Sequence, residues 1–271
     1  MVAEGDVLAR RYRVDRLLGV GGMGLVVAAT DLSRREQVAL KLMRPEAMAS
    51  PELVQRFLRE ASAASHLTSQ HVARVRDFGT LDDGAPFIVM ELLRGEDAAS
   101  LLKRRGPLPV GEAIDIVLQA CDALAEAHAL GIVHRDVTPA NVYLAAMPWG
   151  NMVKVLDLGV ATPGPLDGQN ASMTSTGAVL GSPTYMAPEQ LLSSKHVDAR
   201  ADIWSLGVIL YELLTGKVPI EADSVGGMLG ALHLVEPQPV RATRPDVPPQ
   251  LDAVVLRCMA KNKEARFASA G

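Results

Sequence analysis

The spacing of apolar residues changes its period part-way along the chain, and this change restricts the folds that the sequence can adopt. Up to about residue 92, short runs rich in β-branched and aromatic residues alternate with glycine-rich and polar turns, which is typical of antiparallel strands. From about residue 98 the apolar positions recur at helical spacing, as in 111–130 and 201–214. We therefore expect a small, mostly antiparallel β lobe followed by a larger helical lobe. The expected strands are residues 12–18, 25–30, 37–42, 72–78 and 86–92.

One helix is expected inside the β lobe, beginning after residue 50. The sequence Ser50-Pro51-Glu52 combines a typical N-cap, a proline at the first helical position and an acidic residue in the first turn. Glu60 falls inside the apolar stripe of this helix, and a carboxylate that faces a core needs a cationic partner, because burying it unpaired is very costly. The alternative places Glu60 at the solvent margin of the stripe. The stripe is formed by Leu53, Phe57, Ala64 and Leu67.

Composition excludes several classes of protein. With 48% hydrophobic and 21% charged residues the chain has ample material for a core, so disorder is excluded as its overall state. The net charge of −4 offers no basic surface for nucleic acid or for an anionic membrane. Two cysteines, Cys121 and Cys258, are too few for a disulfide framework or a structural zinc site, and no signal peptide is visible. These features predict a cytoplasmic protein.

A glycine-rich segment at residues 19–26 fits the pattern G-x-G-x-x-G-x-V. Glycines let backbone amides approach phosphate oxygens without a Cβ in the way. A dinucleotide-binding loop of this kind would open a helix, yet residues 25–30 read as a strand. A P-loop would continue with Lys and Ser or Thr, whereas Leu25 follows Gly24. Two readings remain, a phosphate-binding flap on a β-hairpin and a plain hairpin turn.

Lys41 lies in the next expected strand. Strand alternation puts Ala39 and Lys41 on one face and Val38, Leu40 and Leu42 on the other. A small side chain beside a lysine suits a flat base next to its phosphates, and Lys41 is the obvious partner for Glu60. The alternative is a lysine that points into solvent from an edge strand.

A second group of polar residues follows in the helical part. His134-Arg135-Asp136 is followed at residue 141 by an asparagine, and an apolar strand at 153–156 then delivers Asp157. Asn141 and Asp157 supply the oxygen ligands that Mg²⁺ takes alongside substrate phosphates. Asp136 can orient a substrate hydroxyl and accept its proton. No serine nucleophile elbow, zinc-type histidine pair or Cys–His arrangement competes with this set.

Taken in order, these motifs resemble those of a eukaryotic-like (Hanks-type) serine/threonine protein kinase domain, and the chain is most similar to the bacterial members. The match runs from about Tyr12 to the end, and it includes A-P-E at 187–189 and D-I-W-S-L-G at 202–207. The resemblance implies an α+β, two-lobe kinase fold over residues 1–271. It implies an N-lobe at about 10–92, a hinge at about 91–95 and a C-lobe at about 96–271.

The resemblance also implies roles for individual residues. Asp136 would be the catalytic base, Lys41 would hold the α- and β-phosphates of ATP with Glu60 fixing its position, and Asn141 and Asp157 would bind Mg²⁺ or Mn²⁺. Met90 would be the gatekeeper beside a hinge at residues 91–93. For Val26 and Ala39 ordinary strand packing is an equally good explanation. The residues implied for ATP binding are Gly19, Val20, Gly21, Gly22, Gly24, Val26, Ala39, Lys41, Met90, Glu91, Leu93 and Tyr143.

Two further sets of residues are implied outside the chemistry. Glu189 of A-P-E would pair with Arg266 in the interior. Arg135, beside the catalytic Asp136, suggests control by phosphorylation of the segment between D-L-G and A-P-E, because an arginine there can capture a phosphate. We expect autophosphorylation at Thr174 or Thr176; the alternative is a merely polar, mobile loop.

Three residues depart from the family pattern. Thr138 stands where serine/threonine kinases carry a lysine that touches the γ-phosphate, Leu158 replaces a phenylalanine, and Tyr143 is larger than the usual residue under adenine. The main alternative is therefore a weakly active kinase or a pseudokinase scaffold. A small-molecule phosphotransferase is disfavoured by the segment at 181–186, which resembles the substrate-docking loop of protein kinases.

The resemblance implies protein substrates with serine or threonine acceptors and leaves a homodimer open. Residues 262–269 match the last helical region of the family, and Gly271 comes before that helix has a convincing end. We therefore expect residue 271 to be a boundary within a longer protein. This segment has no expected membrane contact, but an anchor after it would make the chain the cytosolic part of a membrane protein.

Overall fold

The computed structural model describes residues 2–21, 24–158, 183–192, 197–222 and 224–271, and for Glu60 and His233 it describes only the backbone. The described chain forms two compact units. The first holds the residues up to Arg94 together with Asp157 and Leu158, and the second holds the other described residues from Gly95 onward. Each unit is described in turn.

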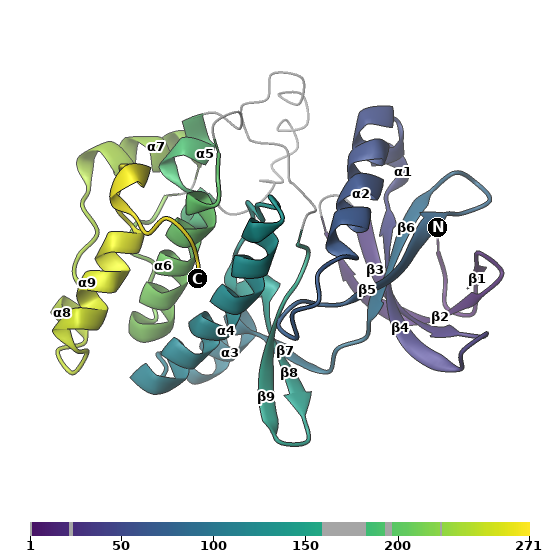
Figure 1. Cartoon of the computed structure of the whole chain (residues 1–271), viewed down its shortest axis with the longest axis horizontal. Coiled ribbons are helices and arrows are strands. Elements are labelled where there is room, and N and C mark those ends of the chain that lie inside the picture. Colours follow the sequence, from purple (N-terminus) through teal and green to yellow (C-terminus); the bar gives the residue numbers. More distant parts are fainter. Residues whose placement is uncertain (1, 22–23, 159–182, 193–196, 223) are drawn as a thin grey trace. The chain divides into compact units, whose positions relative to one another are not determined.

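The first unit is built on a six-stranded sheet with strand order β1-β2-β3-β4-β6-β5, in which every neighbouring pair is antiparallel (Figure 1). The five expected strands are present, within a few residues of their expected bounds. The two-residue β1 was not expected, because so short a strand carries no pattern. The strands are β1 (Val7–Leu8), β2 (Tyr12–Val20), β3 (Gly24–Asp31), β4 (Glu36–Met43), β5 (Val75–Thr80) and β6 (Pro86–Glu91).

Strand β4 lies inside the sheet, between β3 and β6. Val38, Leu40 and Leu42 pack into an apolar cluster with residues of β2, β3 and β6. Ala39 and Lys41 point to the opposite face because side chains alternate along a strand. Lys41 is only 7% exposed, so the reading of this residue as a solvent-facing edge lysine is wrong.

The expected helix after residue 50 is α2 (Pro51–Ala64), and a short α1 (Pro45–Met48) precedes it. The Ser50 hydroxyl accepts a hydrogen bond from the Leu53 amide at 3.4 Å, which caps the first turn as predicted. Phe57 and Ala61 are buried and pack with residues of β4 and β6. The apolar stripe of α2 therefore covers one face of the sheet.

Asp31 at the end of β3 is almost fully buried. Arg11 donates to both of its carboxylate oxygens, at 2.7 and 3.0 Å, and Ser33 donates its amide and its hydroxyl to one of them, at 2.9 and 2.6 Å. The hydrogen bond from Arg11, followed by those from Ser33, holds the pKa of Asp31 well below its usual range. Since the folded-state pKa is depressed, this contribution to stability is present above the unfolded pKa and is lost as the pH falls through the folded one.

We expect Asp31→Asn to lower the free energy of unfolding at pH 7 by about 1.5–3 kcal/mol, because it removes charge-assisted hydrogen bonds. The difference from the wild type should shrink as the pH falls from 5 toward 2, because Asp31 of the unfolded wild-type chain takes up a proton in this range while the folded carboxylate keeps its charge. Urea unfolding at each pH measures it, with Asp82→Asn, an exposed carboxylate on the same unit, as control. A difference in the free energy of unfolding that does not change with pH would contradict the depressed pKa of Asp31.

The second unit is mainly helical and carries a three-stranded antiparallel sheet in the order β7-β8-β9. The helices α4 and α6 end before Gly131 and Gly216, which have φ of +75° and +73°, the left-handed conformation expected at these C-termini. Nearly all residues of α6 are buried, and α4 and α9 pack against it. The elements are β7 (Gly95–Asp97), α3 (Ala98–Arg105), α4 (Val110–Ala129), β8 (Val142–Met147), β9 (Gly150–Val155), α5 (Pro188–Leu192), α6 (Arg200–Thr215), α7 (Val225–Leu234), α8 (Val240–Thr243) and α9 (Pro249–Cys258), with 3₁₀ turns at Pro139–Asn141, Pro183–Tyr185 and Lys263–Ala265.

The expectation of a helix over residues 262–269 is wrong. The only helical turn there is the 3₁₀ turn Lys263–Ala265, and Arg266 has an extended backbone with φ −74° and ψ 176°. This conformation accompanies the inward direction of the Arg266 side chain, which bonds Glu189. A buried ion pair thus lies where the family resemblance implied a helix.

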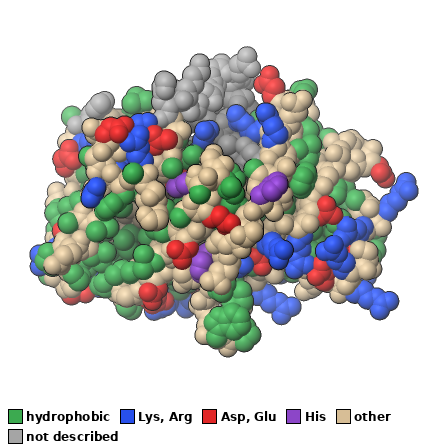
Figure 2. All heavy atoms as spheres, viewed as in Figure 1, with side chains coloured by type: hydrophobic (Ala, Val, Ile, Leu, Met, Phe, Trp, Pro, Cys, Tyr) green, Lys and Arg blue, Asp and Glu red, His purple; other side chains and the backbone are tan. Residues whose placement is uncertain are grey.

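The hairpin between β8 and β9 ends in an apolar tip. Trp149 in this turn is 75% exposed, and Figure 2 shows hydrophobic side chains projecting at the end of the hairpin.

None of the described helices is long and apolar enough to cross a lipid bilayer.

Candidate active site

The glycine-rich segment connects β2 and β3, as expected for a flap on a hairpin. At Gly24 packing requires glycine, because a Cβ would lie 2.1 Å from the carbonyl oxygen of Leu42. Among the described residues, a Cβ at Gly19 would meet no atom within 4 Å, and a Cβ at Gly21 would meet only the Gly24 oxygen at 3.9 Å. Internal packing therefore does not account for these two glycines, which leave bare backbone for a ligand to approach. Gly22 lies outside the described residues.

The sheet register gathers several of the expected nucleotide-binding residues on one face. Val26 lies opposite Lys41, and Ala39 lies opposite Met90. Because side chains alternate along strands, these four residues share a face of the sheet. Val20 is 60% exposed in the hairpin, and Glu91 ends β6, where its carboxylate accepts from the Arg74 amide at 2.9 Å. Leu93 follows β6 and is half-buried.

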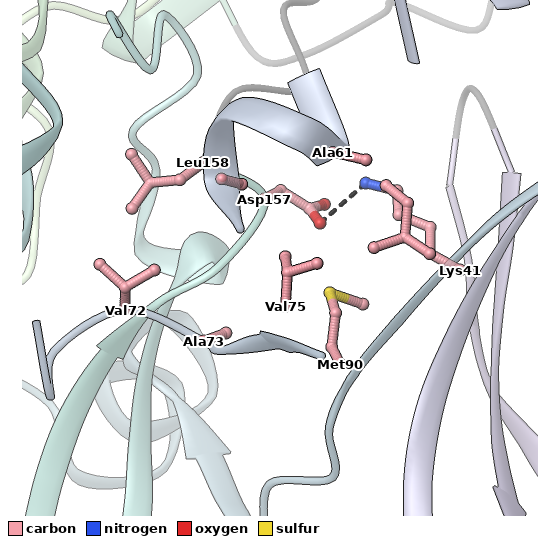
Figure 3. Close-up of a pocket in the computed structure, with 10 residues that line it drawn as sticks. Lys41, Ala61, Val72, Ala73, Val75, Met90, Asp157 and Leu158 are labelled. Atoms are coloured by element: carbon pink, nitrogen blue, oxygen red, sulfur yellow. Dashed lines mark ion pairs between the residues drawn. The ribbon is translucent and has the colours of Figure 1, made fainter. Parts of the chain in front are cut away.

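Lys41 forms an ion pair with Asp157, in which the Lys41 Nζ lies 2.7 Å from Oδ1 (Figure 3). The lysine side chain is 9% exposed and the carboxylate 38% exposed, so the pair is open to solvent on the carboxylate side. Asp157 has φ of +55°, a left-handed conformation that is uncommon for a residue other than glycine and that concentrates at functional sites. The expected partner Glu60 lies in α2, and its side chain is not among those described.

A small cavity of about 20 Å³ lies beside this ion pair. Its walls are mostly apolar and include three alanines, with Met90 and Leu158 among the larger side chains (Figure 3). A space of this size holds about one water molecule, so a purine does not fit inside it. The Lys41–Asp157 pair forms part of the wall of this small cavity. Its lining consists of Lys41, Ala61, Ala64, Val72, Ala73, Val75, Ile88, Met90, Asp157 and Leu158.

In the second unit His134 connects two parts of the candidate site. It is 1% exposed; its Nε2 lies 2.8 Å from the Leu156 carbonyl oxygen, and its Nδ1 accepts from the Asp136 amide at 3.3 Å. Since Nδ1 accepts, the proton is on Nε2, which donates to Leu156. The neutral imidazole thus fixes the backbone of Asp136 relative to the residue that precedes Asp157.

Asn141 orients the carboxylate of Asp136. Its Nδ2 donates to the Asp136 carbonyl oxygen at 2.8 Å and to Asp136 Oδ2 at 3.3 Å. With the amide nitrogen on Asp136, the amide oxygen of Asn141 is left as a donor atom for a cation. Among the described residues there is no cluster of three or more His, Cys, Asp or Glu side chains that could hold a metal. An amide oxygen is the kind of ligand that a divalent cation can take alongside water and substrate phosphates.

Asp202 anchors the backbone next to Asp136, and sequence reasoning gave this residue no role. It is fully buried in α6 and accepts from the amides of His134 and Arg135 at 2.9 and 2.8 Å. Its third partner is the His128 Nε2 at 2.7 Å. The position of Asp202 inside an apolar helix could have indicated this role, because a buried carboxylate requires hydrogen-bond donors around it.

The three residues that depart from the family pattern lie in different surroundings. Thr138 is half-buried and its carbonyl oxygen accepts from the Asn141 amide at 2.9 Å. Tyr143, also half-buried, stands in β8 opposite Lys154 of β9 and Asp97 of β7. Leu158 is 5% exposed and lines the cavity in the first unit.

The two residues expected to pair in the interior do so. Arg266, whose side chain is fully buried, donates to both carboxylate oxygens of Glu189, at 2.7 and 2.9 Å. By contrast, no described residue forms a hydrogen bond or ion pair with the guanidinium of Arg135, which leaves that group available for an anion. Thr174 and Thr176 lie outside the described residues.

Comparison with known proteins gives consistent matches over the whole chain. A family profile described as "Protein kinase domain" matches residues 12–270. The chain is 41% identical over 271 residues to serine/threonine-protein kinase pkn3 of Myxococcus xanthus, covering 98% of this chain and 49% of that protein. It is 39% identical over 266 residues to serine/threonine-protein kinase PknB of Mycolicibacterium smegmatis, covering 97% of this chain and 42% of that protein. The chain thus spans about half the length of the curated relatives it matches.

A solved structure agrees with these matches. The kinase domain of Mycobacterium tuberculosis PknI superposes with a TM-score of 0.77 at 32% identity, covering 100% of this chain and 95% of that one. The small antiparallel sheet with its main helix and the larger helical unit therefore have a close counterpart of known structure.

Proposed function

The chain belongs to the protein kinase domain family, and from this membership we propose that it transfers the γ-phosphoryl group of ATP to serine and threonine hydroxyls of proteins. The observation that carries the proposal is the arrangement around Asp136. The Asp136 amide donates a hydrogen bond to His134, and the Asp136 carbonyl and carboxylate accept hydrogen bonds from Asn141. A carboxylate held in this way suits a base that orients a hydroxyl and accepts its proton.

In the proposed reaction the acceptor hydroxyl oxygen attacks the γ-phosphorus and the bond from that phosphorus to ADP breaks. Asp136 orients the hydroxyl and receives its proton. Catalysis of this kind depends on positioning and electrostatics more than on covalent chemistry. The contacts that fix Asp136 therefore matter as much as its basicity.

The first unit supplies the groups that would hold the nucleotide phosphates. Lys41 provides a nearly buried positive charge, and the bare backbone at Gly19 and Gly21 offers amides to phosphate oxygens. Asp157 and Asn141 would hold the divalent cation, which we propose is Mg²⁺, with Mn²⁺ as the alternative. When bound, that cation neutralises charge on the β- and γ-phosphates.

An assay with radiolabelled ATP tests the proposal. The protein is incubated with ATP labelled at the γ-phosphate, a serine- and threonine-rich protein, and either Mg²⁺, Mn²⁺ or a chelator. We expect label on phosphoserine and phosphothreonine with Mg²⁺ and none with the chelator. Label no greater than in a matched Asp136→Asn sample would overturn the proposal and favour a pseudokinase.

Thr138 bears on how active the enzyme is, since the family lysine would add a cation at the γ-phosphate. We expect Thr138→Lys to raise kcat about tenfold, because one electrostatic contact to the transition state is gained. Steady-state kinetics checks this, with Ala140→Lys as control, since Ala140 is exposed in the same turn. An unchanged kcat in Thr138→Lys would show that the missing lysine costs nothing here.

We further propose that Thr174 or Thr176 becomes phosphorylated by the chain itself and that Arg135 binds the phosphate. No described residue pairs with the guanidinium of Arg135. This supports the proposal, because arginine binds phosphate in a bidentate manner. Mass spectrometry of protein treated with Mg-ATP tests it. Absence of phosphate from both threonines in active protein would contradict it.

The cellular setting is proposed on chemistry alone. Cys121 and Cys258 are free cysteines, and burial raises their pKa values to about 11 and about 12, so both are protonated thiols near neutral pH. We propose a reducing, cytoplasmic location, with protein substrates, either alone or as the cytosolic part of a longer membrane-anchored protein. Homodimerisation is proposed as well, and light scattering across a concentration series tests it.

A further inference from the structure

Gln190 connects the helix after the A-P-E motif to the backbone beside Asp136. It is the third residue of α5 and is 7% exposed. Its Nε2 donates to the carbonyl oxygen of Arg135 at 2.7 Å, and its Oε1 accepts from the amide of Ala187 at 3.0 Å. A buried polar side chain with both ends bonded is held in one position.

The two contacts also determine which way the amide of Gln190 points. A backbone amide can only donate, so Ala187 must face the side-chain oxygen. A carbonyl oxygen can only accept, so Arg135 must face the side-chain nitrogen. The opposite orientation would place donor against donor and acceptor against acceptor. The contact to Arg135 therefore depends on an N–H that only an amide supplies at this position.

The peptide that Gln190 contacts is an unusual one. Arg135 has φ of +66°, a left-handed conformation that is disfavoured for residues other than glycine. Its amide donates to Asp202 Oδ1 at 2.8 Å, and its carbonyl accepts from Gln190. Both sides of this strained residue are thus fixed by buried side chains, one from α6 and one from α5. Such a conformation persists only where its surroundings hold it.

We propose that Gln190 is a positioning residue for Asp136. By holding the carbonyl of Arg135, it fixes the peptide that joins Arg135 to Asp136 and so the direction in which the Asp136 side chain points. The proposal rests on the proposed kinase function and adds a residue to its machinery. It also links α5, and with it the A-P-E motif at 187–189, to the backbone that carries the base. Gln190 itself touches no reacting atom.

The competing explanation is that Gln190 only caps α5 through Ala187. The substitution Gln190→Glu separates the two, because a carboxylate retains an oxygen for the Ala187 amide but has no N–H for the Arg135 carbonyl. If capping is the whole role, Gln190→Glu should behave like the wild type. If positioning is the role, the backbone at Arg135 should loosen while α5 stays in place.

The experiment measures kcat, KM for ATP and ATP affinity for the wild type, Gln190→Glu and the control Leu192→Ala, whose side chain is 62% exposed on the same helix. We expect kcat of Gln190→Glu to fall by about 10²-fold, the loss typical of a small misplacement of a catalytic group. ATP affinity and KM for ATP should not change, since Gln190 holds the base rather than the nucleotide. Wild-type kcat in Gln190→Glu would overturn the proposal.

A second measurement keeps this test separate from that of the kinase function. Amide hydrogen exchange over residues 134–141 should be faster in Gln190→Glu than in the wild type or in Leu192→Ala, whether or not phosphate is transferred. If the wild type is inactive but exchange accelerates, the proposed function fails and the positioning role stands. Unchanged exchange refutes the positioning role. If Gln190→Glu does not melt cooperatively, Gln190→Met, a neutral side chain of similar length, replaces it, and wild-type kcat and exchange in Gln190→Met would refute the role.

Discussion

Asp136→Asn is expected to lower kcat for phosphoryl transfer by about 10²–10⁴-fold, the usual contribution of a positioned general base. The substitution keeps the size and shape of the side chain but removes its ability to take the hydroxyl proton. Asn141 donates to the Asp136 carbonyl at 2.8 Å, and this contact survives in the variant because it uses the backbone. ATP affinity should therefore stay at the wild-type level. Steady-state kinetics and calorimetric titration with ATP measure the two quantities.

The matched control is Asp122→Asn, which changes an exposed carboxylate on α4 of the same unit. It should leave both kcat and ATP affinity unchanged. If Asp136→Asn keeps more than about a tenth of the wild-type kcat, the residue is not acting as the base. If ATP affinity falls together with kcat, Asp136 contributes to the fold of the nucleotide site instead.

The second large effect is on stability, and it follows from Arg266. Its guanidinium is fully buried and donates to Glu189 and to the carbonyl oxygens of Ala260 and Arg200, the latter two at 2.8 and 2.9 Å. Arg266→Leu leaves the carboxylate of Glu189, only 15% exposed, without its cation. We expect the free energy of unfolding to fall by about 3–5 kcal/mol, the usual cost of breaking a buried ion pair. Urea unfolding monitored by circular dichroism measures it.

A double substitution shows where that cost comes from. In Glu189→Leu/Arg266→Leu no charge is left buried, so the protein should be more stable than Arg266→Leu alone. Arg257→Leu is the single-residue control, because Arg257 is exposed and stacks on Phe267 at 4.1 Å, a contact worth about 0.5–1 kcal/mol. A loss in Arg266→Leu no larger than in Arg257→Leu would contradict the account of the buried pair.

Much of the fold could be predicted because its signals are local. Strand alternation around Lys41 and the cap at Ser50 depend on neighbours within a few residues, as do the glycines that end α4 and α6. These elements lie where expected. The helix expected over 262–269 does not form, because Arg266 turns inward to Glu189, a partner far away in the sequence.

Most contacts of the candidate site join residues that are far apart in the sequence. Asp202, Gln190 and the Lys41–Asp157 pair join segments that are distant along the chain, and no periodicity reports such contacts. The positive φ of Arg135 and Asp157 was equally hidden, since residues other than glycine give no warning of it. Motif order indicated which residues carry the chemistry, whereas only the structure shows what holds each of them.

The most direct test of the central claim, that this chain is an active protein kinase, counts turnovers. The wild type is mixed with Mg-ATP and a large excess of a serine- and threonine-rich protein, and ADP and phosphoprotein are quantified over time. We predict that phosphoprotein accumulates well beyond one molecule per enzyme and matches ADP one for one. ATP binding with no phosphoprotein above the Asp136→Asn background would contradict the claim and identify a nucleotide-binding scaffold.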